Sequence, residues 1–202
     1  VIAAGFLFHY GYYATGLIAA WGMTFLDTVD GKLARVTVNS SQLGNIYDHG
    51  IDLISPPFWY LLWALSLPTV VPGCELPITL LIYVFFIGYI GGRLCEGIFK
   101  KWLEPSGIFC WQPIDSYFRL ITGRRNPNLI LLTISLFTGT PDLGLLAVAI
   151  WTLLSTLFLV ARLVMGFQQR RQGMELRSWF LDLDPDTPNP TLAQRCFSNT
   201  GR

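Results

Sequence analysis

The sequence predicts an all-α integral membrane protein built as a bundle of six transmembrane helices, the first of them truncated. Of its 202 residues, 52% are hydrophobic and 13% are charged, whereas a soluble domain usually carries about 25% charged residues. Four segments are apolar over roughly the 20 residues that a membrane span needs. Basic residues gather at one set of helix ends, which is typical of membrane topology.

The predicted spans follow one another along the chain with short connections. Residues 1–8 are apolar but too short to span, and because the chain opens without Met we interpret them as the tail of a first helix. Residues 128–138 are also short, and they span only if the helix extends back through 117–121 with a kink at Pro127. Proline suits the first turn of a helix. The four full-length predicted spans are residues 12–35 (or 14–35), 44–67, 77–99 and 143–165.

The charge distribution sets the predicted orientation and domain limits. Loops 9–13, 68–76 and 139–142 contain no Lys or Arg, so the opposite helix ends are predicted to face the cytoplasm. Residues 1–177 form the predicted membrane domain. Residues 178–202 are polar and rich in Pro, and we expect this cytoplasmic tail to be poorly ordered. The sequence therefore predicts a multi-pass membrane protein with these helix ends in the cytoplasm, and topology accounts for the basic residues without nucleic-acid binding.

Four aspartates interrupt the apolar pattern between residues 27 and 52, in the order D-x2-D-G-x2-A-R-x8-G-x3-D-x3-D. Carboxylates at membrane depth are costly, so they are a functional-site hypothesis by default. The short polar linker 36–43 predicts antiparallel neighbouring helices whose stripes face each other. Because residues three and four apart share a helix face, the pattern gives two stripes: Asp27, Asp30, Gly31 and Ala34 on the first helix, and Gly44, Asp48 and Asp52 on the second.

Four close carboxylates repel one another unless cations neutralise them. Lys32 and Arg35 are too few basic partners in this stretch for four acids. Oxygen ligands favour a hard ion such as Mg²⁺, Mn²⁺ or Ca²⁺. The small residues on the same faces leave room for a ligand to approach the backbone. The pattern therefore predicts a divalent-cation site near one membrane surface.

The pattern resembles the signature of the CDP-alcohol phosphotransferase (CDP-alcohol phosphatidyltransferase) family at every defining position. The resemblance implies transfer of a phosphoalcohol group, in phospholipid biosynthesis, from a CDP-linked donor to an alcohol acceptor with release of CMP. It also implies two Mg²⁺ (or Mn²⁺) ions, and it allows a homodimer as in the family. Because the chain lacks the extra helices of the longer eukaryotic choline and ethanolamine enzymes, we expect a prokaryotic-type phospholipid synthase. Its donor is then a CDP-linked lipid such as CDP-diacylglycerol, and the group transferred is phosphatidyl.

Carried over residue by residue, the resemblance assigns a role to each position of the pattern. Asp27, Asp30 and Asp48 are expected to be metal ligands, and Asp52 a ligand and the general base. Elementary chemistry agrees, because attack on a diphosphate needs charge neutralisation and a proton acceptor within reach. The CDP donor is expected to lie against five residues: Asp30, Gly31, Ala34, Arg35 and Gly44.

Arg119, Arg124 and Arg125 precede a predicted helix on the same side of the membrane. A basic pocket there would favour a phosphorylated acceptor, such as glycerol phosphate or inositol phosphate. Ordinary positive-inside enrichment explains the three arginines equally well, and an uncharged alcohol such as serine then fits better. The sequence leaves the acceptor open.

Two other classes of membrane protein use aspartates in helices, and both stay open as alternatives. A divalent-cation transporter needs acids along a path through the membrane, but the predicted spans carry none near the outer surface. An intramembrane prenyltransferase also uses Asp-bound Mg²⁺, but it places its two Asp motifs in distant parts of a longer chain.

Overall fold

The computed structural model describes residues 1–37, 42–71, 75–182 and 197, with side chains described at all of these except 31–37, 42–49, 52 and 182. Regular structure in this part of the chain is helical, apart from one isolated bridge between Val70 and Pro77, so the predicted all-α class is confirmed. The elements are α1 (Ile2–His9), α2 (Tyr13–Thr37), α3 (Gln42–Leu65), α4 (Ile78–Trp102), η1 (Ile108–Cys110), α5 (Pro113–Ile121), α6 (Arg125–Phe137), α7 (Pro141–Arg171) and η2 (Trp179–Asp182).

The chain divides into two compact units. The first contains residues 1–90 and 123–155, and the second contains residues 91–122 and 156–202. The predicted tail begins with residues that are well packed within the second unit, since Ser178 is buried and its hydroxyl donates to the Cys110 carbonyl oxygen at 2.8 Å. Residues 183–196 and 198–202, on which the prediction of poor order mainly falls, lie outside the described residues.

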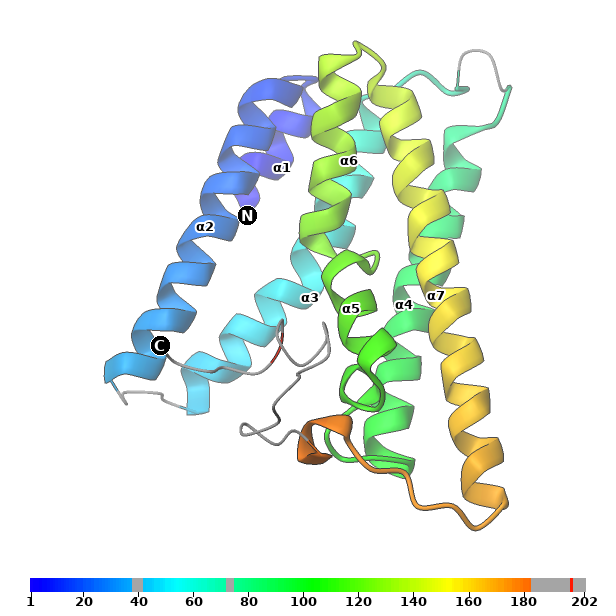
Figure 1. Cartoon of the computed structure of the whole chain (residues 1–202). Helices are drawn as coiled ribbons and strands as arrows, with labels where there is room; N and C mark the ends of the chain where they lie inside the picture. Colours follow the sequence, from blue (N-terminus) through cyan, green and yellow to red (C-terminus); the bar gives the residue numbers. More distant parts are fainter. Residues whose placement is uncertain (38–41, 72–74, 183–196, 198–202) are drawn as a thin grey trace. The chain divides into compact units, whose positions relative to one another are not determined.

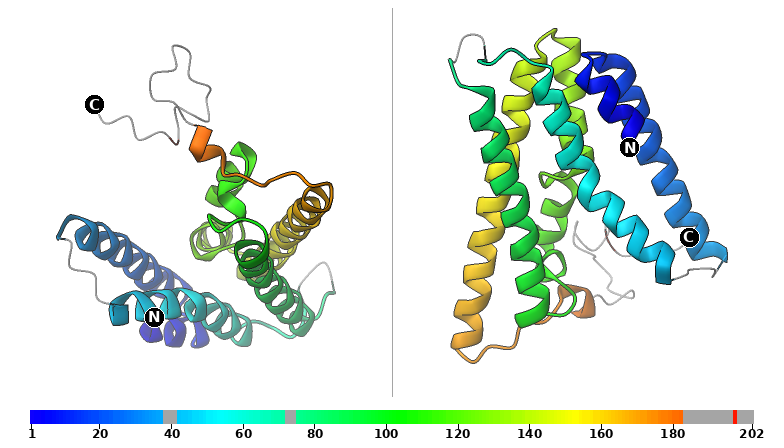
Figure 2. Two further views of the ribbon diagram at one scale, coloured as in Figure 1. Left: turned by 90° about the horizontal axis from the view of Figure 1, so that it is seen from below. Right: turned by 180° about the vertical axis from the view of Figure 1, so that it is seen from behind.

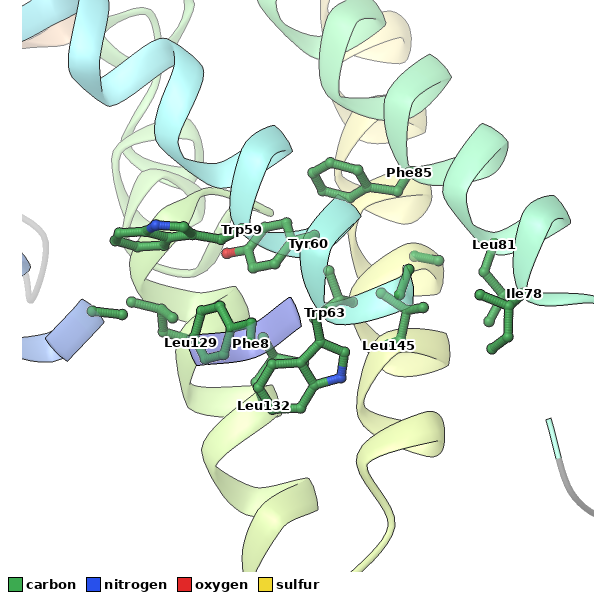
Figure 3. Packing of buried hydrophobic residues seen from close by; sticks show 14 of the residues in the cluster. Phe8, Trp59, Tyr60, Trp63, Ile78, Leu81, Phe85, Leu129, Leu132 and Leu145 are labelled. Atoms are coloured by element: carbon green, nitrogen blue, oxygen red, sulfur yellow. The ribbon is translucent and has the colours of Figure 1, made fainter. Parts of the chain in front are cut away.

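The core of the first unit is aromatic and is centred on α3 (Figure 3). Helix α1 packs against both α2 and α3, and the ring of Phe8 lies 5.1 Å from the ring of Trp63. Buried Trp side chains need a partner for the indole N–H. Trp59 donates to the Val1 carbonyl oxygen at 2.8 Å, and Trp63 donates to that of Pro141 at 3.0 Å. Residues 2–9 are thus helical as predicted, and they are fixed to α3.

Two glycines in left-handed conformation reverse the chain between successive helices. Gly11 has φ 77° between α1 and α2, and Gly139 has φ 70° between α6 and α7. Glycine adopts this region without the steric cost that a Cβ brings. The turn at Gly11 lets α1 lie beside α2, which makes their contact local in sequence (Figure 1).

Two of the described helices, α4 and α7, are long and apolar enough to cross a membrane. Their best 18-residue windows have mean hydropathies of 1.8 and 2.4. Within its described side chains, helix α3 carries a shorter apolar stretch, Leu53–Leu65. The predicted long helix through Pro127 is instead two helices, α5 and α6, since the backbone is extended at Arg124 (φ −112°, ψ −175°). Pro127 lies in the first turn of α6, as predicted.

Candidate functional site

The aspartate pattern lies on α2 and α3, which run in opposite directions in the first unit (Figure 1). Asp27 and Asp30 lie on α2, where the Asp27 side chain is 19% exposed and Asp30 is exposed. Asp48 and Asp52 lie on α3. Their side chains lie outside the described set, as do those of four predicted CDP-site residues: Gly31, Ala34, Arg35 and Gly44. The convergence of all four carboxylates therefore stays a prediction.

Asp27 has a basic partner that the sequence did not reveal. Nη2 of Arg125 lies 2.7 Å from Oδ2 of Asp27, and the Arg125 side chain is 11% exposed. Its Nη1 also lies 3.5 Å from the Met23 sulfur, one turn earlier on α2. A charge-assisted hydrogen bond of this kind is roughly twice as strong as a neutral one. The start of α6 is therefore joined to the acidic face of α2.

A second contact aligns α6 with α2 along their length. The indole N–H of Trp21 donates to Oγ1 of Thr133 at 3.1 Å, and that hydroxyl donates to the Leu129 carbonyl oxygen at 2.7 Å. Because Trp21 precedes Asp27 while Thr133 follows Arg125, the two helices are antiparallel. The two contacts lie about two helical turns apart on each helix, which fixes the register of Arg125 against Asp27.

Contacts with α7 and α3 determine where α6 begins. The Gly123 N–H donates to Oγ of Ser155 at 2.8 Å, and a Cβ at Gly123 would lie only 2.8 Å from the Thr152 Cα. Glycine is therefore needed for this close approach to α7. Asn128, which is buried, donates to Thr152 Oγ1 at 3.3 Å. The hydroxyl of Tyr60, on α3, donates to the Arg125 carbonyl oxygen at 3.3 Å.

Helix α3 continues through Pro56 and Pro57, and its ribbon is bent along its length (Figure 2). Proline lacks an N–H, so each one frees the carbonyl four residues earlier and kinks the helix. The freed carbonyls are those of Asp52 and Leu53. Tyr89 of α4 compensates at Leu53, since its hydroxyl donates to that carbonyl oxygen at 3.0 Å. The bend thus lies one turn after the predicted general base, and α4 supports it.

The three arginines of the predicted acceptor site have different surroundings. Arg119 is exposed on α5, in the second unit. Arg124 is half-buried as the N-cap residue of α6, in the first unit. Arg125 follows it and binds Asp27. The structure therefore joins one predicted acceptor residue to one predicted metal ligand, a relation that the sequence analysis missed.

A buried ion pair in the second unit was also missed. Nη2 of Arg162, on α7, donates to Oδ2 of Asp115 at 2.6 Å and to Oε1 of Gln112 at 2.8 Å. Its guanidinium carbon lies 4.2 Å from the ring centre of Trp111. An arginine inside the most apolar span was the available sequence signal, because charges there are rare and almost always paired.

The described residues fit a hard divalent cation only in part. Asp27 and Asp30 supply carboxylate oxygens one turn apart on α2, and such oxygens are the ligands that Mg²⁺ and Mn²⁺ prefer. Arg125 donates a hydrogen bond to Oδ2 of Asp27. A carboxylate has a second oxygen, which can bind a cation. Among the described side chains, no group of three or more His, Cys, Asp or Glu lies close enough to hold a metal. Asp48 and Asp52 lie outside that set.

Comparisons with known proteins match the region that contains the aspartates. Residues 1–95 match the family model of CDP-alcohol phosphatidyltransferase. The chain is 46% identical over 46 residues to cholinephosphotransferase 1 of Gallus gallus, a match covering 23% of this chain and 14% of that protein. No solved structure matches the chain. The resemblance predicted from Asp27 to Asp52 is therefore confirmed, since residues 1–95 are similar to the CDP-alcohol phosphatidyltransferase family.

Proposed function

We propose that the protein transfers a phosphoalcohol group from a CDP-linked donor to the hydroxyl of an alcohol acceptor and releases CMP. The observation that carries this proposal is the complete aspartate pattern on antiparallel α2 and α3, inside the segment that matches the family model. The acceptor oxygen attacks the phosphorus that bears the alcohol, and the bond from that phosphorus to CMP breaks. The acceptor proton goes to a protein base.

Each residue of the pattern has a role in this proposal. Asp52 accepts the acceptor proton, and it also binds metal together with Asp27, Asp30 and Asp48. Two bound Mg²⁺ (or Mn²⁺) ions would neutralise the charge of the diphosphate. The small residues let the CDP moiety approach the helix backbone, and Arg35 pairs with phosphate. The CDP site contains Asp30, Gly31, Ala34, Arg35 and Gly44.

Two donor classes are supported by different observations. The family model is named for phosphatidyl transfer, which favours a CDP-linked lipid donor and a small acceptor. Arg124 then favours a phosphorylated acceptor, because arginine binds phosphate through charge-assisted bonds. The relative from Gallus gallus is a cholinephosphotransferase, which favours phosphocholine as the group transferred, from CDP-choline. The transfer chemistry at phosphorus is the same for both classes.

We also propose a multi-pass arrangement in the plasma (inner) membrane with the site facing the cytoplasm. Helices α4 and α7 expose large apolar side chains, such as Ile87 at 69% and Leu157 at 55%, which suits contact with lipid. Both carry a basic pair in their last turn, Lys100–Lys101 and Arg170–Arg171, which supports a cytoplasmic position for both carboxyl ends.

The test is release of CMP by the purified chain in lipid nanodiscs with Mg²⁺. One arm supplies CDP-diacylglycerol with glycerol phosphate, inositol phosphate or serine, and the other supplies CDP-choline with diacylglycerol. We expect CMP in one arm, and its loss when EDTA is added. Asp52→Asn should lower turnover by about two orders of magnitude or more, as expected for a general base, while donor binding persists.

Glu175→Gln is the matched control, because Glu175 is an exposed carboxylate in the second unit and should leave turnover unchanged. CMP release in neither arm would contradict the proposed reaction. Activity of Asp52→Asn within tenfold of wild type would contradict the assignment of the base and leave the reaction class standing.

A further inference from the structure

We propose that Arg125 is a positioning residue for the divalent-cation site, and that it acts by holding the carboxylate of Asp27. This inference rests on the proposed function, because it takes Asp27 as a metal ligand. It places an essential part of the site on α6, outside the segment 1–95 that matches the family model. It also gives Arg125 a different role from that of an acceptor-binding residue.

The ion pair is sheltered enough for its orientation to matter. Exposed ion pairs contribute little because water screens them and their side chains are mobile. Here Arg125 is 11% exposed and Asp27 is 19% exposed, with 2.7 Å between Nη2 and Oδ2. The arginine takes one carboxylate oxygen and restricts rotation of the group. When a cation binds the other oxygen, the Asp27 side chain therefore loses less conformational entropy.

Arg125 is itself held from several directions. Its carbonyl oxygen accepts from Tyr60 of α3, and its guanidinium lies against Met23 of α2. The turn before it is fixed to α7 through Gly123 and Ser155. A donor held in this way can orient an acceptor, which a mobile surface arginine cannot do. Rigid support from the surrounding shell is what keeps a metal site in its productive geometry.

Two effects of opposite sign act on a cation near this pair. The positive guanidinium repels the cation, while the ordered carboxylate binds it with a smaller entropy loss. Loss of a hydrogen-bonded partner of a metal ligand typically weakens metal affinity about 10–100-fold. We take orientation to be the larger effect because three helices fix Arg125. The sign of the change in affinity is therefore the decisive observation.

The experiment is calorimetric titration of Mn²⁺ alone into the purified full chain, without donor or acceptor. Arg125→Ala removes both donor and charge, and should weaken Mn²⁺ binding at least about tenfold. Arg125→Lys keeps a charged donor without the planar fork, and should recover part of the loss. Arg171→Gln removes an exposed arginine from the end of α7 and should change nothing. Circular dichroism confirms that each variant stays helical.

The outcomes separate this inference from the proposed function. Equal or tighter Mn²⁺ binding by Arg125→Ala overturns the positioning role, and so does Arg125→Lys binding no better than Arg125→Ala. If Arg125→Ala does not fold, Arg125→Lys decides alone, and affinity equal to wild type overturns the role. Asp27→Asn reports on the proposed function instead. If it binds Mn²⁺ as wild type does, Asp27 is no ligand, and the cation site of the proposed function fails.

Discussion

The guanidinium of Arg125 donates to the carboxylate of Asp27 over 2.7 Å, although the two residues are 98 positions apart in the sequence. The contact joins the first residue of α6 to α2 within one compact unit. It brings a segment from the other half of the chain into contact with Asp27, the first aspartate of the pattern. Variants of α6, α7 and α4 are therefore expected to affect a site on α2 and α3.

Tyr89→Phe tests the support of the bend in α3. The substitution keeps the ring, which stacks on Phe85 at 5.7 Å, but it leaves the Leu53 carbonyl without its donor. Pro57 has no N–H to replace it, so the segment carrying Asp52 becomes less ordered. We expect turnover to fall about tenfold, less than the roughly 100-fold that a 1 Å misplacement can cost, with the donor KM unchanged.

The matched control is Tyr83→Phe, which removes a hydroxyl from the same helix at a side chain that is 67% exposed. It should leave turnover unchanged. Equal activities of wild type and Tyr89→Phe would show that the bend needs no hydrogen bond from α4.

Gly123→Ala tests the close approach of the α5–α6 connection to α7. A Cβ would lie 2.8 Å from the Thr152 Cα, which is backbone and cannot rotate away. Overpacking of this kind typically costs about 1–3 kcal/mol, so we expect a lower thermal midpoint. Because the same turn carries Arg125, Mn²⁺ affinity should fall as well.

Gly97→Ala provides the comparison, since nothing lies within 4 Å of a Cβ at this exposed position in α4. Alanine is favoured over glycine inside a helix by about 1 kcal/mol, so stability should stay the same or rise. A thermal midpoint of Gly123→Ala equal to that of wild type would refute the packing argument.

Asp115→Asn tests the buried ion pair of the second unit. The exposed fractions of the Arg162 and Asp115 side chains are 7% and 1%, so removing the carboxylate leaves a buried charge without its counter-ion. Breaking a buried pair in this way costs about 3–5 kcal/mol. The free energy of unfolding, measured in a graded denaturing detergent, should fall by that order.

The double variant Asp115→Asn with Arg162→Met removes both charges, so it should be more stable than Asp115→Asn alone. If Asp115→Asn costs less than about 1 kcal/mol, the value typical of an exposed pair, the ion pair does not stabilise this unit.

Arg124→Ala tests the proposed phosphorylated acceptor. If Arg124 binds the acceptor phosphate, the acceptor KM should rise at least about tenfold, since a hydrogen bond to a charged group contributes about 1.5–3 kcal/mol. The donor KM should stay the same. Steady-state kinetics with each substrate varied in turn measures both constants, and two unchanged constants would favour an uncharged acceptor.

The sequence by itself determined the features that depend on local spacing. Residues three and four apart share a helix face, so the Asp27–Asp30 spacing on α2 and the Asp48–Asp52 spacing on α3 could be read directly. The short linker determined that these helices are antiparallel. High hydropathy marked α4 and α7, and Pro127 marked the first turn of α6.

Only the tertiary structure decided the contacts between distant segments. Arg125 carries the same local signal as Arg124, a basic residue before an apolar helix, yet Arg125 is the one that binds Asp27. That choice depends on the register between α2 and α6, which Trp21, Thr133 and the Gly123 approach to α7 set together. Helical periodicity determines on which face of its own helix a residue lies. The residue that it contacts on another helix depends on side-chain packing along the whole chain.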